Sequence, residues 1–159
     1  MEIKTGYLYH IKNIFFDIVN DRGLMINHEK GHSRPSYLAI KNNNLLWFVP
    51  ISSKVDKYKK IVNQKIKKYG ACKSIMIRKI ANQEVAILLQ NAFPACEEYV
   101  SHIHTMKNGN PLKVIDSLKK EIINNFNYML SMKQEGIDLF FTDIDKIKEI
   151  MLEELIVKE

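Results

Sequence analysis

The chain has 159 residues, a net charge of +6 and 46% apolar residues, a composition that indicates a globular protein and excludes a disordered one. A chain of this length buries about two-thirds of its unfolded surface in one core, so we expect a single domain over residues 1–159. No apolar run approaches the roughly 20 residues that cross a membrane, and the start MEIKTGYLYH lacks the apolar segment of a signal peptide. The two cysteines are too few for a disulfide framework or a four-ligand zinc site. We therefore expect a cytoplasmic protein with no membrane contact.

The first predicted elements alternate short strands with one helix. Residues 6–11 alternate as a strand does, and residues 13–20 have helical spacing. Residues 21–35 form a polar loop with two glycines and a proline. Residues 37–40 and 45–51 are predicted strands, and the three asparagines between them favour a hairpin turn.

A lysine-rich helix is predicted next. Between residues 55 and 69 the apolar side chains recur at helical spacing, and lysines occupy the opposite face. Ser53 followed by Asp56 fits a capping box at the start of this helix. A helix N-terminus also favours anions, so Ser52, Ser53 and Lys54 would surround a phosphate there, and the two roles are compatible.

The rest of the chain predicts more strands and then helices. Strands are expected over residues 72–78, 84–89 and 98–103, the first two joined by a turn. Two long C-terminal helices follow, over residues 111–133 and 143–157, and Thr142 is the expected N-cap of the second. This order predicts an α+β domain with a mostly antiparallel sheet.

The charge of the chain is strongly polarised. Residues 54–79 hold ten basic residues and one acid, a net of +9, whereas the tail from Gln134 onward holds eight acids and three lysines. A face of this charge suits a polyanion, most often a nucleic acid.

The histidines predict no metal site. His102 and His104 alternate on a predicted strand, but two ligands without a third do not define a site, and we interpret them as structural or surface residues. His28 and His32 lie in the polar loop. His32 is the better functional candidate because Pro35 fixes the chain just after it, and an ordinary solvated histidine is the alternative.

The distribution of acidic residues predicts that any phosphoryl chemistry at this site is metal-free. The middle of the chain is nearly devoid of them, and the C-terminal acids alternate with lysines as on a solvated helix face. We therefore expect neither a metal nor a cofactor. RNA is the expected substrate, because it brings its own nucleophile, the 2′-OH, and needs only groups that orient the phosphate, stabilise charge and move protons. On this interpretation Ser52, Ser53 and Lys54 hold a scissile phosphate.

The motifs resemble those of a known family. A short strand and helix, a polar loop ending in SRPSYLAI, a hairpin, FVPISSK and a basic helix occur here in the order seen in ToxN/AbiQ-type endoribonuclease toxins of type III toxin–antitoxin systems. The CptN-like or TenpN-like branch is the most similar. The resemblance spans nearly the whole chain and is sharpest at residues 32–37 and 48–57. It implies a strongly twisted antiparallel sheet with surrounding helices, related to the Kid/MazF toxins.

The resemblance also implies an activity and partners. The activity is metal-independent, sequence-specific RNA cleavage that leaves a 2′,3′-cyclic phosphate and a 5′-OH, with cellular mRNA as the target and phage defence as the role. The partner is a small structured antitoxin RNA, a pseudoknot repeat that the toxin cuts from its precursor and that then inhibits it. Closed assemblies, in which RNA bridges several toxin chains, are typical of the family.

Site residues are carried over by position. Ser52 and Ser53 match the family's hydroxyl pair. Many members read Ser-Pro-Lys there, and because no proline intervenes here, Lys54 is favoured as the catalytic lysine and Lys57 is the alternative. His32 stands where some members have a tyrosine. The predicted catalytic residues are Ser52, Ser53, Lys54, His32 and Lys57, and the predicted RNA-binding residues are Arg34, Ser36, Tyr37, Lys57, Lys60, Lys67, Lys68 and Arg78.

Two alternative functions use the same surface. One is a non-catalytic RNA-binding module, and the other is a toxin whose positive face binds an acidic protein target and which has a protein antitoxin. The joint occurrence of the serine pair, the lysine and the SRPSY element favours the RNA-cleaving toxin.

Overall fold

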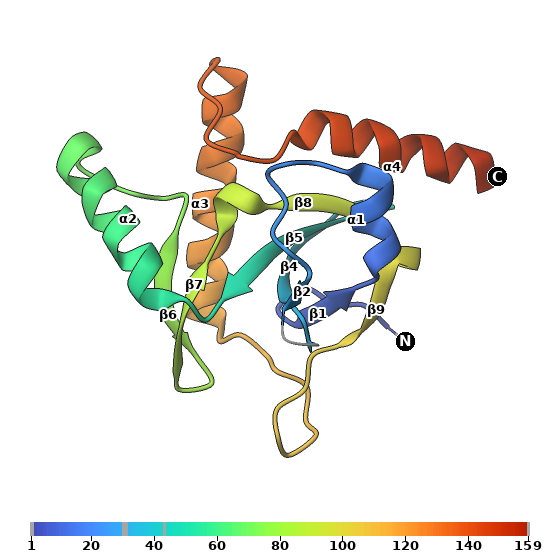
Figure 1. Ribbon diagram of the computed structural model, residues 1–159, viewed down its shortest axis with the longest axis horizontal. Helices are drawn as coiled ribbons and strands as arrows, with labels where there is room; N and C mark the ends of the chain where they lie inside the picture. The colour runs from blue at the N-terminus through green and yellow to red at the C-terminus, as the bar shows by residue number, and fades with distance from the viewer. Residues whose placement is uncertain (1, 30–31, 43, 159) are drawn as a thin grey trace.

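The core of the molecule is one antiparallel sheet (Figure 1). The computed structural model describes residues 2–29, 32–42 and 44–158, with the backbone alone at residues 28, 29, 32 and 158. Over these residues seven strands pair in the order β6 (Met76–Ile80), β7 (Gln83–Ile87), β5 (Leu45–Ser52), β4 (Pro35–Asn42), β1 (Leu8–Ile11) and β9 (Val100–Ile103), and β8 (Phe93–Cys96) also pairs with β5.

Helices surround the sheet, and the predicted α+β fold with two C-terminal helices is confirmed. The helix α2 (Val55–Tyr69) lies beside β6 and β7, α3 (Asp116–Gln134) packs against β4, and α4 (Ile144–Lys158) runs along β8 (Figure 1). Within the described residues, none of the helices is long and apolar enough to cross a membrane. The described helices are α1 (Asn13–Val19), α2 (Val55–Tyr69), α3 (Asp116–Gln134) and α4 (Ile144–Lys158).

The central hairpin β4–β5 is buried on both of its faces. Successive strand residues point to opposite sides, so Phe48 and Val49 enter different halves of the core. Phe48 packs among residues that include Phe15 of α1 and Met151 of α4. Val49 packs in the cluster that contains Phe126 of α3. Each fully buried side chain of this size contributes roughly 1.5–3 kcal/mol, which explains why β5 is apolar along almost its whole length.

Helix α2 has the predicted bounds but packs along only part of its length. Tyr58 near its start is buried, whereas Ile66 is 45% and Tyr69 is 68% exposed. Gly70 ends the helix in the left-handed conformation, φ 84°. The apolar stripe predicted for this helix therefore faces the core at its N-terminal end and solvent at its C-terminal end.

The predicted capping box at the start of α2 is wrong. The N-cap position is Lys54, and no side chain caps the helix. The backbone N–H of Lys54 instead donates to Ser52 Oγ at 3.2 Å, and the N–H of Val55 donates to the Ser53 carbonyl at 2.9 Å. These two local bonds form the turn, so the Ser53 hydroxyl is not used as a cap.

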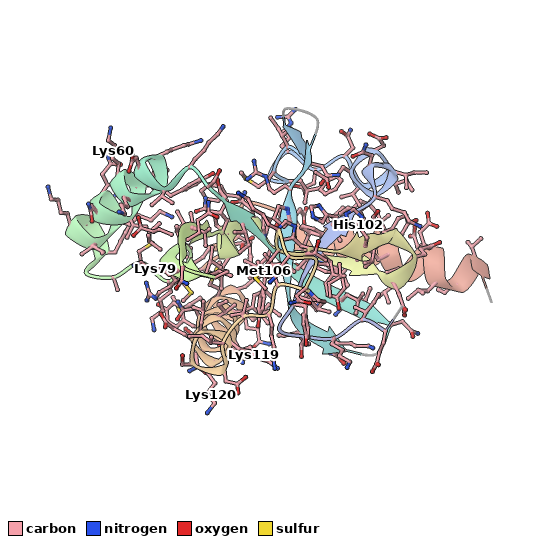
Figure 2. All side chains as sticks on the ribbon, turned by 90° about the horizontal axis from the view of Figure 1, so that it is seen from below. Lys60, Lys79, His102, Met106, Lys119 and Lys120 are labelled. Atoms are coloured by element: carbon pink, nitrogen blue, oxygen red, sulfur yellow. The ribbon has the colours of Figure 1, made fainter. Side chains whose placement is uncertain are left out.

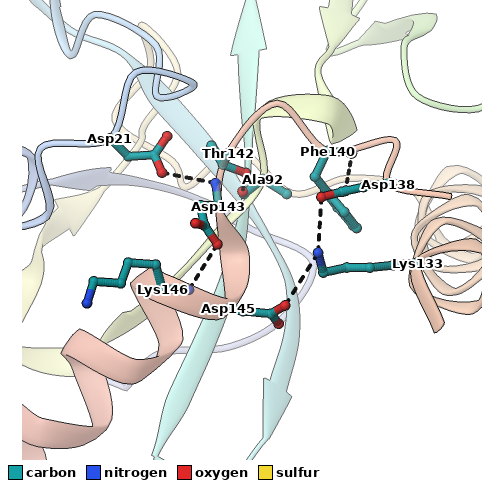
Figure 3. Close-up of polar contacts among 9 residues, drawn as sticks. All are labelled: Asp21, Ala92, Lys133, Asp138, Phe140, Thr142, Asp143, Asp145 and Lys146. Carbon is teal, nitrogen blue, oxygen red and sulfur yellow. Dashed lines mark hydrogen bonds and ion pairs between the residues drawn. The ribbon is translucent and has the colours of Figure 1, made fainter. Parts of the chain in front are cut away.

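The predicted cap of α4 is also wrong, by one residue (Figure 3). The hydroxyl of Thr142 donates to the Ala92 carbonyl at 2.5 Å. The neighbouring Asp143 accepts the Lys146 N–H at 3.1 Å through Oδ1, which is the geometry of an N-cap. The N–H of Asp143 donates to Asp21 Oδ2 at 2.9 Å, so this helix start is tied to the loop after α1.

Helix α3 begins at Asp116 rather than at residue 111. The segment before it is extended, because the N–H of Leu112 donates to the His104 carbonyl at 3.0 Å and the N–H of Val114 donates to the Gly6 carbonyl at 2.8 Å. These bonds to two other segments replace the first helical turns that the sequence predicted.

The remaining strand bounds shift by a few residues. The hairpin of β6 and β7 turns tightly at Ala81 and Asn82, which have φ of 51° and 64°. Strand β9 starts two residues later than predicted, after a 3-10 turn at Glu97–Tyr99. Strand β8 was not predicted. Asn43, in the predicted turn between β4 and β5, lies outside the described residues.

Candidate functional site

A cleft of about 690 Å³ opens where β5 ends. One wall comes from the facing ends of β4 and β5, a second from the β6–β7 hairpin, and a third from the segment that follows β9. Figure 2 views the molecule from below, with Met106 of the third wall near the centre, between Lys79 and His102. The polar and charged side chains that line the cleft are Ser33, Arg34, Ser53, Gln83, His104, Thr105 and Lys107.

The antiparallel pairing of β4 with β5 places Arg34 and Ser53 at the same cleft. Ser36 near the start of β4 is opposite Pro50 near the end of β5, so the residues just beyond them also meet. Arg34 is fixed in this place because its Nη1 donates to the Ile51 carbonyl at 3.3 Å and its Nε donates to the Ile26 carbonyl at 3.2 Å.

The predicted hydroxyl pair is divided between two environments. Ser53 is exposed and lines the cleft together with Ile51, two residues earlier. Ser52 points the other way, as alternation along a strand requires, and is 1% exposed. Its Oγ accepts the N–H of Lys54. The hydroxyl of Ser53 is therefore accessible to a ligand in the cleft, whereas the hydroxyl of Ser52 stabilises the turn before α2.

The two candidate lysines lie at the start of α2. Lys54 and Lys57 are both exposed, and neither is among the described residues that line the cleft. The ammonium of Lys57 lies 5.3 Å from the centre of the Tyr58 ring. Both lysines neighbour Ser53 in sequence, and the choice between them stays a prediction.

Two of the residues expected to contact RNA are enclosed by the sheet. Ser36 is 4% exposed and Tyr37 is 0% exposed. Burial raises the pKa of Tyr37 to about 12, and its hydroxyl has no hydrogen-bond partner among the described residues. Neither side chain is positioned to reach RNA in this structure.

The other predicted RNA contacts are on the surface. Helix α2 exposes Lys60, Lys67 and Lys68. Lys60 is labelled at the upper left of Figure 2. Arg78 of β6 is also exposed, but its guanidinium forms an ion pair with Glu121 of α3, which partly offsets its charge.

The polar loop between α1 and β4 contains a small hairpin. The strands β2 (His28–Glu29) and β3 (His32–Ser33) pair with each other, and His32 is opposite Glu29. The side chains of His28 and His32 lie outside the described residues, so the predicted catalytic role of His32 stays a prediction. Ser33, directly after His32, lines the cleft.

Three histidines gather at the edge of the cleft. His10 of β1 is opposite His102 of β9, and their rings stack with centres 4.4 Å apart. His10 Nε2 lies 2.8 Å from His104 Nδ1, and His10 Nδ1 contacts Ser33 Oγ. His10 is not among the site residues that the sequence predicts. The alternation of His102 and His104 could have indicated a functional site. Their partner His10, however, lies on β1, and only the structure shows that β1 pairs with β9.

His10 and His104 have lowered pKa values. Burial, followed by the nearby His102 and His104, lowers the pKa of His10 from 6.5 to about 4. Burial, followed by His102, also lowers the pKa of His104. The neutral form of both rings therefore predominates at pH 7.

The electrostatics of the cleft suit a phosphate. Arg34 and Lys107 supply positive charge, and no acid is present among the described lining residues. Hydroxyls of Ser33 and Ser53 and the imidazole of His104 supply hydrogen-bonding groups. Over the described residues, no group of three or more His, Cys, Asp or Glu side chains is arranged to hold a metal ion.

The chain matches no protein-family model and no curated protein sequence. Its fold, however, is similar to that of a solved structure. AbiQ, described as a lactococcal anti-phage endoribonuclease belonging to the type-III toxin–antitoxin system, aligns with a TM-score of 0.75 over 98% of this chain and 100% of AbiQ. The aligned residues are 11% identical, so the likeness shows a shared fold.

Proposed function

We propose that this chain is an endoribonuclease toxin of a type III toxin–antitoxin system. Two observations support the proposal. The fold is similar to that of AbiQ over the whole length of both chains. The observation that carries it, however, is the cleft, in which Ser53, Arg34 and Lys107 present hydroxyl and positive groups, with no carboxylate among the described residues that line it. A backbone phosphate of RNA fits this set of groups.

The proposed reaction is an internal transesterification that uses no metal ion. The 2′-oxygen of the substrate attacks the adjacent phosphorus, the bond between phosphorus and the 5′-oxygen breaks, and a 2′,3′-cyclic phosphate and a 5′-OH result. Ser53 donates a hydrogen bond to a phosphate oxygen, and Arg34 stabilises the charge that develops there. Lys54 adds a third donor from the start of α2, with Lys57 as the alternative.

The lysines of α2 are proposed to bind the RNA beyond the cleft. The first turn of α2 begins within two residues of Ser53, which lines the cleft. An RNA strand bound in the cleft therefore continues along this helix. Exposed Lys57, Lys60, Lys67 and Lys68 offer successive phosphate contacts along it. Arg78, paired with Glu121, is a weaker candidate.

The partners follow from the proposed class. A structured antitoxin RNA binds the same cleft and helix, is cut from its repeat precursor there, and inhibits the toxin by staying bound. Several chains bridged by such RNAs form a closed assembly in the cytoplasm, and cellular mRNA is the target of the free toxin.

Growth assays test this proposal. Induced expression of the chain in bacterial cells should arrest growth, and expression of the Ser53→Ala variant should not. Co-expression of a short repeat RNA encoded beside the gene should restore growth. Rescue by a neighbouring small protein and not by the RNA would contradict the proposed class and favour a protein antitoxin.

A further inference from the structure

A chain of polar side chains leads from the sheet into the cleft. Ser33 Oγ contacts Nδ1 of His10, and Nε2 of His10 lies 2.8 Å from Nδ1 of His104. His10 is 8% exposed, whereas the ring of His104 lines the cleft. Because Nδ1 of His104 is turned to His10, its Nε2 is the atom left for a ligand. None of the described residues hydrogen-bonds that Nε2.

The backbone holds His104 firmly at this position. Its N–H donates to the Leu8 carbonyl at 2.8 Å, and its carbonyl accepts the N–H of Leu112 at 3.0 Å. The backbone at His104 is thus fixed between β1 and the segment that leads to α3, and the contact of Nδ1 with His10 holds the ring. A side chain held by its backbone and by one ring nitrogen loses little conformational freedom when a substrate binds.

The hydrogen-bond chain couples the tautomers of His10 and His104 to the direction of the contact with Ser33 Oγ. A neutral imidazole has one donor and one acceptor nitrogen. When the Nδ1–H of His10 donates to Ser33 Oγ, Nε2 of His10 is an acceptor and takes the Nδ1–H of His104. Nε2 of His104 then carries a lone pair directed at the cleft, which is the state of a general base.

We propose that His104 is the general base of the RNA cleavage described above and that His10 is the positioning residue that fixes its tautomer, an inference that rests on the proposed function. Nε2 of His104 takes the proton of the 2′-OH as the new bond between the 2′-oxygen and phosphorus forms. The bond between phosphorus and the 5′-oxygen breaks, and the departing oxygen takes a proton from water. The imidazolium then returns its proton to solvent.

The surroundings of His104 favour its neutral form. Among the described residues, the groups that face the two histidine rings are the His102 ring from β9 and the Ser33 hydroxyl from β3, and Arg34 and Lys107 line the same cleft as His104. Burial lowers the pKa of His104, and the nearby His102 adds to this effect. The base form therefore predominates at neutral pH and disappears as pH falls through this lowered pKa.

Single-turnover cleavage of an RNA oligonucleotide tests the role of His104, with a cleavage site mapped beforehand in total bacterial RNA. We expect His104→Ala to lose at least about a hundredfold in rate. Binding of the same oligonucleotide with a 2′-deoxy sugar at the site should be unchanged. His102→Ala is the matched control, because His102 is exposed, stacks on His10 and is not among the residues that line the cleft.

The pH profile separates a base from a structural residue. The wild-type rate should rise tenfold per pH unit on an acid limb below pH 6.5 and then level off. His102→Ala removes a neighbour that lowers the pKa of His104, so its acid limb should move to higher pH while its plateau is kept. A His104→Ala variant that cleaves at the wild-type rate, or a His102→Ala limb that does not move, overturns the assignment.

The tautomer is measurable in the intact chain without any variant. With 15N-labelled histidine, the imidazole nitrogens of His104 should show a proton on Nδ1 and none on Nε2 at pH 7. A proton on Nε2 overturns the base assignment even if the enzyme is active. A wild-type chain that cleaves no RNA would instead contradict the proposed function itself.

Discussion

His10 and His104 are 94 positions apart in the chain, yet a hydrogen bond of 2.8 Å joins Nε2 of one to Nδ1 of the other. The contact exists because β1 lies between β4 and β9 in the sheet and brings the buried His10 against the segment after β9. Burial at this position favours the neutral form of His10 in the folded state, so the stability of the fold depends on pH.

Acid should therefore weaken the fold through His10. Its pKa is lowered from 6.5 to about 4, so the unfolded state binds the proton more strongly. The contribution is fully present above about pH 6.5 and is lost as pH falls toward 4. Between pH 7 and pH 5 the free energy of unfolding should fall by roughly 2 kcal/mol from this group. Urea denaturation at several pH values measures it, and a His10→Asn variant with the same pH dependence would contradict the assignment.

Ser53 and Ser52 should separate catalysis from stability. Ser53 lines the cleft and does not cap α2, so Ser53→Ala should keep the wild-type unfolding free energy and slow cleavage by about a hundredfold. Ser52→Ala removes a buried acceptor from the Lys54 N–H and should cost about 1 kcal/mol of unfolding free energy. Cleavage rates and urea denaturation on both variants measure the two effects. Equal activity of Ser53→Ala and the wild type would remove Ser53 from the mechanism.

Lys54 and Lys57 are distinguished in the same assay. Both are exposed, so Lys54→Ala and Lys57→Ala should fold with nearly wild-type stability. We expect Lys54→Ala to bind RNA and to be severely defective in cleavage, and Lys57→Ala to lose affinity only. The reverse pattern assigns the catalytic lysine to Lys57. Wild-type cleavage by both variants excludes a lysine of this segment from the reaction.

The basic face of α2 should determine the salt dependence of RNA binding. Replacing Lys57, Lys60, Lys67 and Lys68 together by Gln should reduce the slope of log affinity against log salt by about three units, because each phosphate contact releases a counterion. A double Lys→Gln variant at Lys146 and Lys148 is the control, since these exposed lysines lie on the acidic helix α4. An unchanged slope in the quadruple variant would place the RNA elsewhere.

Local sequence patterns predicted much of the fold. The bounds of α2 follow from its apolar spacing and from Gly70 after it, and the β4–β5 hairpin follows from two apolar runs joined by asparagines. Strand β8 escaped prediction because its four residues, Phe93–Cys96, are all buried, show no alternation and include Pro94. The extended segment before α3 depends on bonds to His104 and Gly6, which no local pattern contains.

The site was less predictable than the fold, because it depends on strand register. The FVPISSK motif predicted that Ser53 lies at a strand end. Only the three-dimensional structure shows that Ser53 enters the cleft and that Ser52 does not. Tyr37 looked available in SRPSY but its side chain is fully buried in the core. His10 was missed because its partners Ser33, His102 and His104 lie on segments that are distant in the sequence.

The most direct test of the central claim is to map the ends of RNA cut by the purified chain in excess EDTA. We predict that cleavage persists and that every product pair carries a 2′,3′-cyclic phosphate and a 5′-OH, since the substrate's own 2′-oxygen is the nucleophile and the cleft supplies the remaining groups. The cleft variant Ser53→Ala serves as the control for contaminating nucleases. Cleavage that requires added Mg²⁺ and leaves 3′-OH ends would contradict the account.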